Sequence, residues 1–158
     1  MALLLSFDTA TPHLAVVLSN DAAPIASRVD ATVVLSHAEK LNVFIEAVML
    51  EAGRSLKEID AVAVGIGPGW YTGLRIGLSA AKGLCFALDK PLIGMGTLDV
   101  LLAEFMHAGR KLEANDTLVP MVDARRMEVY ARTYGSDLKW IDETAPLILD
   151  QAWCDARP

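Results

Sequence analysis

The sequence predicts an α/β protein whose mixed sheet is flanked by helices and is followed by the start of a second, similar lobe. Apolar strand-like runs alternate with longer amphipathic runs, which is the pattern of α/β folds. A glycine-rich segment at 65–77 joins a strand-like run to a helix-like run. After the polar stretch 109–115, a strand–turn–strand pattern with an aspartate at the turn repeats the layout of the N-terminal hairpin. We therefore predict lobes at 1–108 and 116–158.

Five strands are predicted in the first lobe. Apolar runs at 3–7 and 14–18 flank a turn of aspartate, threonine and proline, which indicates a hairpin. A third strand is expected at 24–31. The apolar run 61–64 precedes the glycine-rich segment, and 91–95 forms another short strand.

The first predicted helix covers 36–52. Ser36 and Glu39 fit a capping box at its start, and Gly53 fits its end. One face carries an ordinary core stripe of Leu41, Ile45, Val48 and Ala52. The opposite side carries a second apolar strip of Val43, Ala47 and Leu50.

The second predicted helix, 72–88, is apolar nearly all round, with a thin polar stripe of Arg75, Ser79 and Lys82. Such a helix is buried on most sides, against either the rest of this chain or a partner. We favour an interface with a partner. The candidate interface residues are Val43, Ala47, Leu50, Arg75, Leu78, Ala81, Lys82 and Cys85.

The remaining elements are shorter. A helix is expected at 97–107, and strands at 118–122 and 129–134 surround a turn at 123–126. Residues 140–158 are expected to form an exposed end of the chain.

Composition limits the functional classes. Of 158 residues, 53% are hydrophobic and 22% charged, which suits a packed core, and the net charge of −6 disfavours unaided nucleic-acid binding. Cys85 and Cys154 lack metal-ligand and disulfide spacing, as in a reducing cytosol. No signal peptide or uncharged apolar run of about 18 residues is present. We expect a soluble cytoplasmic protein with no membrane partner.

The glycine-rich segment carries the candidate ligand chemistry. A glycine turn between a strand and a helix can direct backbone N–H groups toward a phosphate or carboxylate. The candidate phosphate-binding residues are Asp8, Thr9, Thr11, Gly67, Gly69, Thr72 and Gly73. The alternative is a tight turn without a ligand, in which Asp8 accepts hydrogen bonds from nearby backbone N–H groups. We favour this alternative for Asp8.

Three stretches taken together resemble the TsaB (YeaZ) family, whose members belong with the sugar kinases, actin and Hsp70 in the actin-like ATPase superfamily. These stretches are Phe7-Asp-Thr-Ala-Thr11, Ser36-His37, and Gly67-Pro-Gly-Trp-Tyr-Thr-Gly-Leu-Arg-Ile-Gly77 followed by Ala80-Ala-Lys-Gly-Leu84. The resemblance extends to about residue 134 and implies an actin-like, ribonuclease H-like lobe. It departs at Trp70, where the family usually has serine or alanine, and in length, which suggests a truncated second lobe.

The resemblance also bears on metal binding. In the family's catalytic relative, TsaD, two histidines four residues apart bind a metal after the strand equivalent to 91–95. The matching positions here are Thr97 and Leu101, which cannot form such a site. The three histidines, His13, His37 and His107, offer no pair with ligand spacing on one helix, so we expect no metal.

The resemblance implies a non-catalytic subunit for making threonylcarbamoyladenosine in tRNA. The helices 36–52 and 72–88 would bind TsaD, or form a homodimer in its absence, and TsaE would join the larger complex while TsaD handles the tRNA. The alternative is an actin-like ATPase or phosphotransferase that uses ATP and magnesium at Asp8 and the glycine turn. A structural dimer without a tRNA role is a third possibility.

Overall fold

The computed structural model describes residues 1–21, 23–32 and 36–155. The chain divides into two compact units, Met1–Met95 and Gly96–Pro158. The lobe bounds derived from the sequence, 1–108 and 116–158, stay a prediction.

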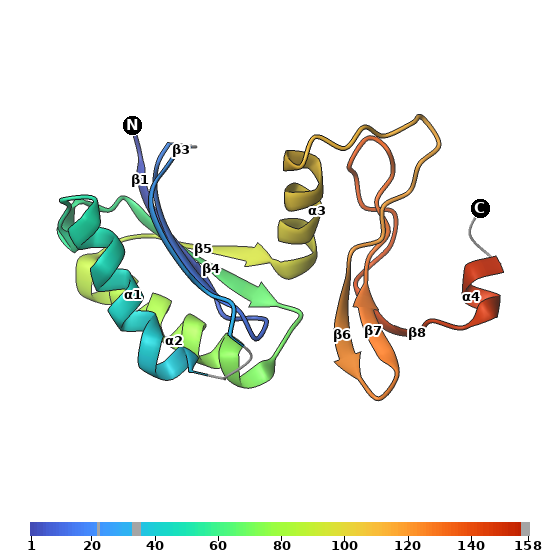
Figure 1. Ribbon diagram of the computed structural model, residues 1–158, viewed down its shortest axis with the longest axis horizontal. Helices are drawn as coiled ribbons and strands as arrows, with labels where there is room; N and C mark the ends of the chain where they lie inside the picture. The colour runs from blue at the N-terminus through green and yellow to red at the C-terminus, as the bar shows by residue number, and fades with distance from the viewer. Residues whose placement is uncertain (22, 33–35, 156–158) are drawn as a thin grey trace. The chain divides into compact units, whose positions relative to one another are not determined.

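The first unit is built on a five-stranded mixed sheet with the order β3-β2-β1-β4-β5 (Figure 1). The central strand β1 runs antiparallel to β2 and parallel to β4, and β2 runs antiparallel to β3. All five strands lie close to their predicted positions. They are β1 (Leu3–Asp8), β2 (Leu14–Asn20), β3 (Ala23–Asp30), β4 (Ala61–Gly67) and β5 (Leu92–Gly96).

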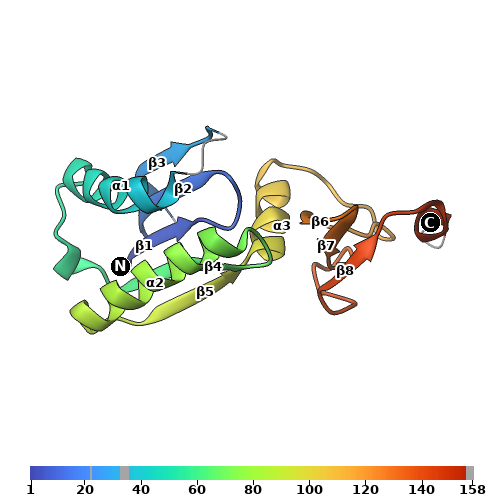
Figure 2. The ribbon, with the colours of Figure 1, turned by 90° about the horizontal axis from the view of Figure 1, so that it is seen from below.

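Helices α1 (His37–Glu51) and α2 (Tyr71–Leu88) lie side by side on one face of this sheet (Figures 1 and 2). Alternate residues of β1 and β2 are buried beneath them because successive strand side chains point to opposite faces. The resulting core contains Leu5, Phe7, Val16, Leu41, Ile45, Val48, Val62, Val64 and Ala81. The predicted α/β class and both long helices are confirmed.

The predicted capping box at the start of α1 is wrong. Ser36 occupies the N-cap position but makes no side-chain cap bond; its hydroxyl instead donates to Asp30 Oδ2 at 3.2 Å. A capping box does occur in the short 3-10 helix η1 (Leu56–Glu58), between Ser55 and Glu58. A long-range hydrogen bond therefore replaces the local one that the sequence suggested.

The second unit contains helix α3 (Thr97–His107) and a three-stranded antiparallel sheet with the order β6-β7-β8. The strands are β6 (Met121–Arg125), β7 (Glu128–Ala131) and β8 (Ala145–Ile148), and a short helix α4 (Gln151–Asp155) follows. The sequence predicted α3 correctly and missed β8 and α4. Its strands at 118–122 and 129–134 only overlap β6 and β7, and most of the turn predicted at 123–126 belongs to β6. Among the described residues, no helix is both long and apolar enough to span a membrane.

Candidate partner interface and glycine turn

The glycine turn connects β4 to α2 through residues 67–70. Gly67 has φ +97°, a backbone conformation that residues with a side chain rarely adopt. The peptide bond from Gly67 to Pro68 is cis. Trp70 follows as the N-cap residue of α2 and makes no side-chain cap bond. Glycine at position 67 thus allows the backbone conformation with which β4 ends.

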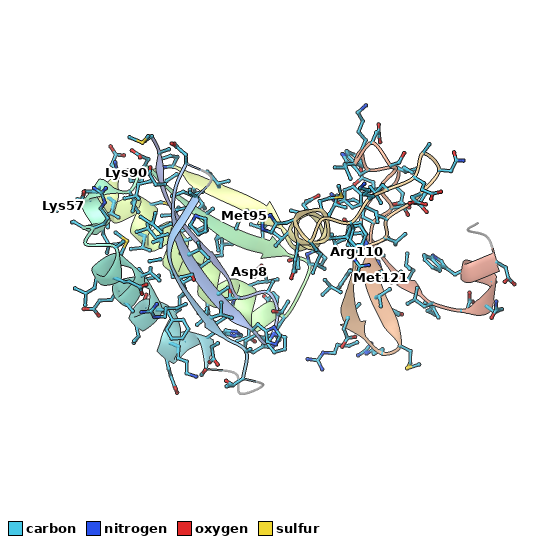
Figure 3. All side chains as sticks on the ribbon, turned by 45° about the horizontal axis from the view of Figure 1, so that its top comes forward. Asp8, Lys57, Lys90, Met95, Arg110 and Met121 are labelled. Atoms are coloured by element: carbon cyan, nitrogen blue, oxygen red, sulfur yellow. The ribbon has the colours of Figure 1, made fainter. Side chains whose placement is uncertain are left out.

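Asp8, labelled in Figure 3, is the last residue of β1. Its Oδ1 accepts a hydrogen bond from the backbone N–H of Ala10 at 2.6 Å, which is the Asx-type turn expected as the ligand-free alternative. The carboxylate lies over β4, where a Cβ on Gly65 would be 2.6 Å from the same oxygen. Gly65 therefore leaves room for the Asp8 side chain.

Thr9 is completely buried, and its hydroxyl donates to the backbone carbonyl of Gly73 at 2.8 Å. Gly77, one turn farther along α2, faces the same hydroxyl, and a Cβ there would lie under 3.0 Å from Thr9 Oγ1. This burial and this bond do not favour the predicted role of Thr9 as a phosphate ligand, which stays a prediction. Its side chain joins the β1–β2 loop to α2 and does not reach the surface.

The β1–β2 loop also contacts the backbone of the glycine turn. The Trp70 N–H donates to the carbonyl of Ala10 at 2.6 Å. A Cβ on Gly69 would meet that carbonyl, and a Cβ on Gly73 would meet the carbonyl of Thr9, both closer than 3.0 Å. These glycines are therefore required by close backbone packing, whether or not the turn binds a ligand.

The other candidate phosphate ligands lie at the edge of this arrangement. The Thr11 hydroxyl accepts a hydrogen bond from the His13 N–H at 3.2 Å, within the β1–β2 loop. Thr72 is exposed in the first turn of α2. Their role toward a ligand, like that of Gly67, stays a prediction.

The outer surface of α1 carries apolar side chains that nothing in the described chain covers. Val43 and Leu50, seven residues apart on one stripe, are 59% and 81% exposed. Ala47 lies between them and is half-buried. The second apolar strip predicted for this helix therefore lies at the surface.

The outer stripe of α2 combines charge with aromatic rings. Arg75 and Lys82 are exposed, and the sequence analysis missed the two aromatic residues at the ends of their stripe, Tyr71 and Phe86, which are 71% and 92% exposed. The guanidinium of Arg75 lies 5.5 Å from the centre of the Tyr71 ring. The spacing 71, 75, 79, 82 and 86 was a usable signal, because residues three or four apart share a helix face.

Three of the predicted interface residues on α2 lie toward the core. Ala81 is fully buried and its side chain belongs to the core, which does not favour its predicted place at an interface. Leu78 and Cys85 are partly buried and pack against that core. The Cys85 thiol donates to the Pro91 carbonyl at 3.5 Å, and burial raises the pKa of this thiol.

A groove of about 490 Å³ adjoins the outer face of α1 at Leu50. It is lined by Asn42, Ile45, Glu46, Met49, Leu50, Arg54, Leu56 and Leu84. The lining is mainly aliphatic, with charged groups at the rim, as in surfaces that receive apolar side chains of a partner.

The start of α1 is fixed by Asp30, which is 9% exposed at the end of β3. Its carboxylate accepts hydrogen bonds from Lys40 Nζ at 2.5 Å, from Ser36 Oγ, and from the N–H and hydroxyl of Thr32. The bond from Lys40 is the largest cause that holds the pKa of Asp30 well below its ordinary value. This network anchors the helix that carries Val43 and Leu50.

The histidines are spread over the chain. His13 and His107 are exposed, whereas His37 is buried at the start of α1. Within the described residues, no three His, Cys, Asp or Glu side chains are arranged to hold a metal ion. The expected absence of a metal stays a prediction.

Several known proteins have sequences similar to this chain. The family model for TsaD, tRNA N6-adenosine threonylcarbamoyltransferase, matches residues 31–156. The tRNA threonylcarbamoyladenosine biosynthesis protein TsaB of Escherichia coli is 36% identical over 137 residues, which are 85% of this chain and 55% of that protein. An uncharacterized protein of Mycobacterium tuberculosis is 35% identical over 87% of this chain and 62% of its own length. The chain thus spans only about half to three fifths of these relatives.

Solved structures agree with this assignment. YeaZ from Pseudomonas aeruginosa superposes with a TM-score of 0.83 at 29% identity, covering 96% of this chain and 70% of that one. The ethanolamine utilization protein EutJ from Carboxydothermus hydrogenoformans, with a TM-score of 0.54 at 14% identity, shares the fold alone. The predicted actin-like α/β fold is confirmed, and the chain belongs to the family described by the TsaD model, in which its named relatives include TsaB (YeaZ) proteins and tRNA N6-adenosine threonylcarbamoyltransferases.

Proposed function

We propose that this chain is a non-catalytic subunit in the formation of threonylcarbamoyladenosine in tRNA, and that it binds and activates the TsaD transferase. The relatives named TsaB are biosynthesis proteins for this nucleoside, and the family model is that of the transferase. The single observation that carries the proposal is the set of apolar side chains exposed on α1 and α2.

We call this surface the docking face and define it by Val43, Leu50, Tyr71, Arg75, Lys82 and Phe86. Four of these six residues are large apolar or aromatic side chains that are more than half exposed. Large exposed apolar side chains that gather on one surface mark binding sites in proteins, and aromatic residues and arginine are enriched at interfaces. In the absence of TsaD, the same face would support a homodimer.

The glycine turn supports a binding role over a catalytic one. The hydroxyl of Thr9 and the N–H of Trp70 are already hydrogen-bonded within the chain, so they are not free to hold a phosphate group. The proposal therefore assigns no ATP, magnesium or metal to this chain. It leaves the tRNA to TsaD, adds TsaE to the larger complex, and places the chain in the cytoplasm.

The test is to mix the purified chain with TsaD from the same organism and to measure the mass of the complex in solution. Leu50→Asp and Phe86→Asp should weaken the complex by about 10-fold or more, because each places a charge on apolar surface that becomes buried. Val29→Asp is the matched control, since Val29 is 64% exposed on β3, away from the docking face.

Two results would contradict the proposal. The first is a chain that remains monomeric with and without TsaD at micromolar concentrations. The second is ATP hydrolysis by the chain alone that Asp8→Ala abolishes, which would establish the actin-like enzyme instead.

A further inference from the structure

His37 is an unusual residue for the first turn of α1. Its side chain is 2% exposed, and among the described residues neither ring nitrogen has a hydrogen-bond partner. A buried polar group without a partner destabilises the folded state, and such groups are rare enough in native structures to need an explanation. The two nitrogens therefore give His37 no stabilising hydrogen bond, and any favourable contribution of this side chain comes from the packing of its ring.

The ring of His37 packs against the indole of Trp70. The two ring centroids are 5.2 Å apart, and the planes are inclined by 44°, a separation at which aromatic pairs attract each other. His37 begins α1, and Trp70 precedes the first residue of α2. One ring pair thus connects the starts of the two helices that carry the docking face.

Trp70 is itself held from three directions. Its N–H donates to the Ala10 carbonyl, its carbonyl accepts from the Leu74 N–H at 2.9 Å, and its ring edge lies against Gly73, where a Cβ would be 2.5 Å from Cε3. The indole therefore lies between the start of α1 and the first turn of α2. The absence of a side chain at Gly73 makes room for it.

We propose that His37 and Trp70 form an aromatic latch that sets the position of α1 against α2, and that Trp70 is a positioning residue for the docking face without belonging to it. The latch rests on geometry alone, whereas its effect on a partner rests on the proposed function. In this arrangement the ring of His37 contributes packing against Trp70, and its two nitrogens contribute no hydrogen bond.

The first experiment measures the latch without any partner. Hydrogen–deuterium exchange at the imidazole C2 position, followed by mass spectrometry, reports the exposure of each histidine. In the wild type, His37 should exchange far more slowly than the exposed His13 and His107. Trp70→Ala should speed His37 exchange by about 10-fold or more, because local opening exposes the ring, while Trp70→Phe and the control Trp140→Ala should leave it slow.

A second pair of variants covers the case in which Trp70→Ala does not fold. His37→Phe keeps a ring against Trp70 and removes both unpartnered nitrogens, so its Tm should equal or exceed that of the wild type. His37→Ala removes the ring and should lower the Tm. The latch is refuted if His37→Phe destabilises the chain as much as His37→Ala, or if a folded Trp70→Ala variant leaves His37 exchange slow.

The partner measurement separates the latch from the proposed function. With TsaD, Trp70→Ala should bind about 10-fold more weakly than Trp70→Phe, a difference of about 1.4 kcal/mol. Equal binding by these two variants would overturn the positioning role and leave the proposed function intact. If the wild type does not bind TsaD at all, the proposed function fails, and the exchange experiment still decides whether the latch exists.

Discussion

Alanine substitutions at three glycines of α2 should change stability in opposite directions. Gly83 lies on the exposed part of the helix, and a Cβ there would meet nothing within 4 Å. Gly83→Ala should therefore stabilise the folded state by about 1 kcal/mol, the difference in helix propensity between the two residues. Gly73 and Gly77 lie in the same helix, but both face the β1–β2 loop.

Gly77→Ala gains the same stability from helix propensity, but it loses more stability through poorer packing. The new methyl group would displace the Thr9 hydroxyl from its 2.8 Å hydrogen bond to the Gly73 carbonyl. Leaving buried groups unpaired costs about 1–3 kcal/mol, and overpacking a tight site costs about 1–3 kcal/mol more. After the propensity gain of about 1 kcal/mol, we expect a net destabilisation of about 1–5 kcal/mol.

Gly73→Ala should be more damaging, because its methyl group would meet the backbone carbonyl of Thr9 and the edge of the Trp70 indole. A side-chain hydroxyl can rotate away, whereas a backbone carbonyl can move only with its loop. The expected order of stability is Gly83→Ala, wild type, Gly77→Ala and then Gly73→Ala.

Urea unfolding followed by circular dichroism measures these differences, with the slope m checked for a two-state transition. If Gly77→Ala is as stable as Gly83→Ala, the β1–β2 loop does not pack on α2 as described. The conclusion that the glycines pack against the β1–β2 loop of the same chain would then be wrong.

Three further predictions concern single side chains. Lys40 holds the pKa of Asp30 below its ordinary value of 3.8. The ionised Asp30 therefore stabilises the fold fully above pH 3.8, and this stabilisation is lost as the pH falls below that value. Asp30→Asn should make the free energy of unfolding, measured by urea titrations at about pH 2–7, fall less steeply at acid pH. With the other cysteine replaced by serine, Cys85 should react slowly with a thiol reagent in the folded chain and quickly in urea, because burial raises its pKa. Tyr134→Phe should cost about 1 kcal/mol in thermal unfolding, because it removes the buried hydroxyl that donates to Asp99.

Local sequence rules located the five strands and the two long helices of the first unit to within about three residues. Periodicity and Gly53 predicted a helix at 36–52, and α1 covers His37–Glu51. They failed where a distant residue competes: Ser36 bonds to Asp30 across the loop between β3 and α1, and no local pattern reveals that choice. The short strand β8 was missed because its four residues carry too little pattern to distinguish a strand from an irregular end.

The interface prediction shows the same limit on a helix that is apolar on several sides. Periodicity cannot say which apolar side of α2 faces the sheet, so Ala81 was assigned to the surface although it is buried. The aromatic ends of the polar stripe, Tyr71 and Phe86, were the better indicator. A helix stripe that carries charged residues faces solvent because burying a charge is costly, so large rings on the same stripe are expected to be exposed as well.

The glycine pattern poses the same ambiguity at the turn. Glycines between a strand and a helix suit a phosphate, which needs free N–H groups, and they equally suit a second backbone segment that comes too close for a Cβ. The hydrogen bonds of the structure help to distinguish a phosphate site from close backbone packing, because each donor serves one main partner. Here the Trp70 N–H serves Ala10 and the Thr9 hydroxyl serves Gly73. A ligand that used either of these two donors would have to break a contact between the β1–β2 loop and the start of α2.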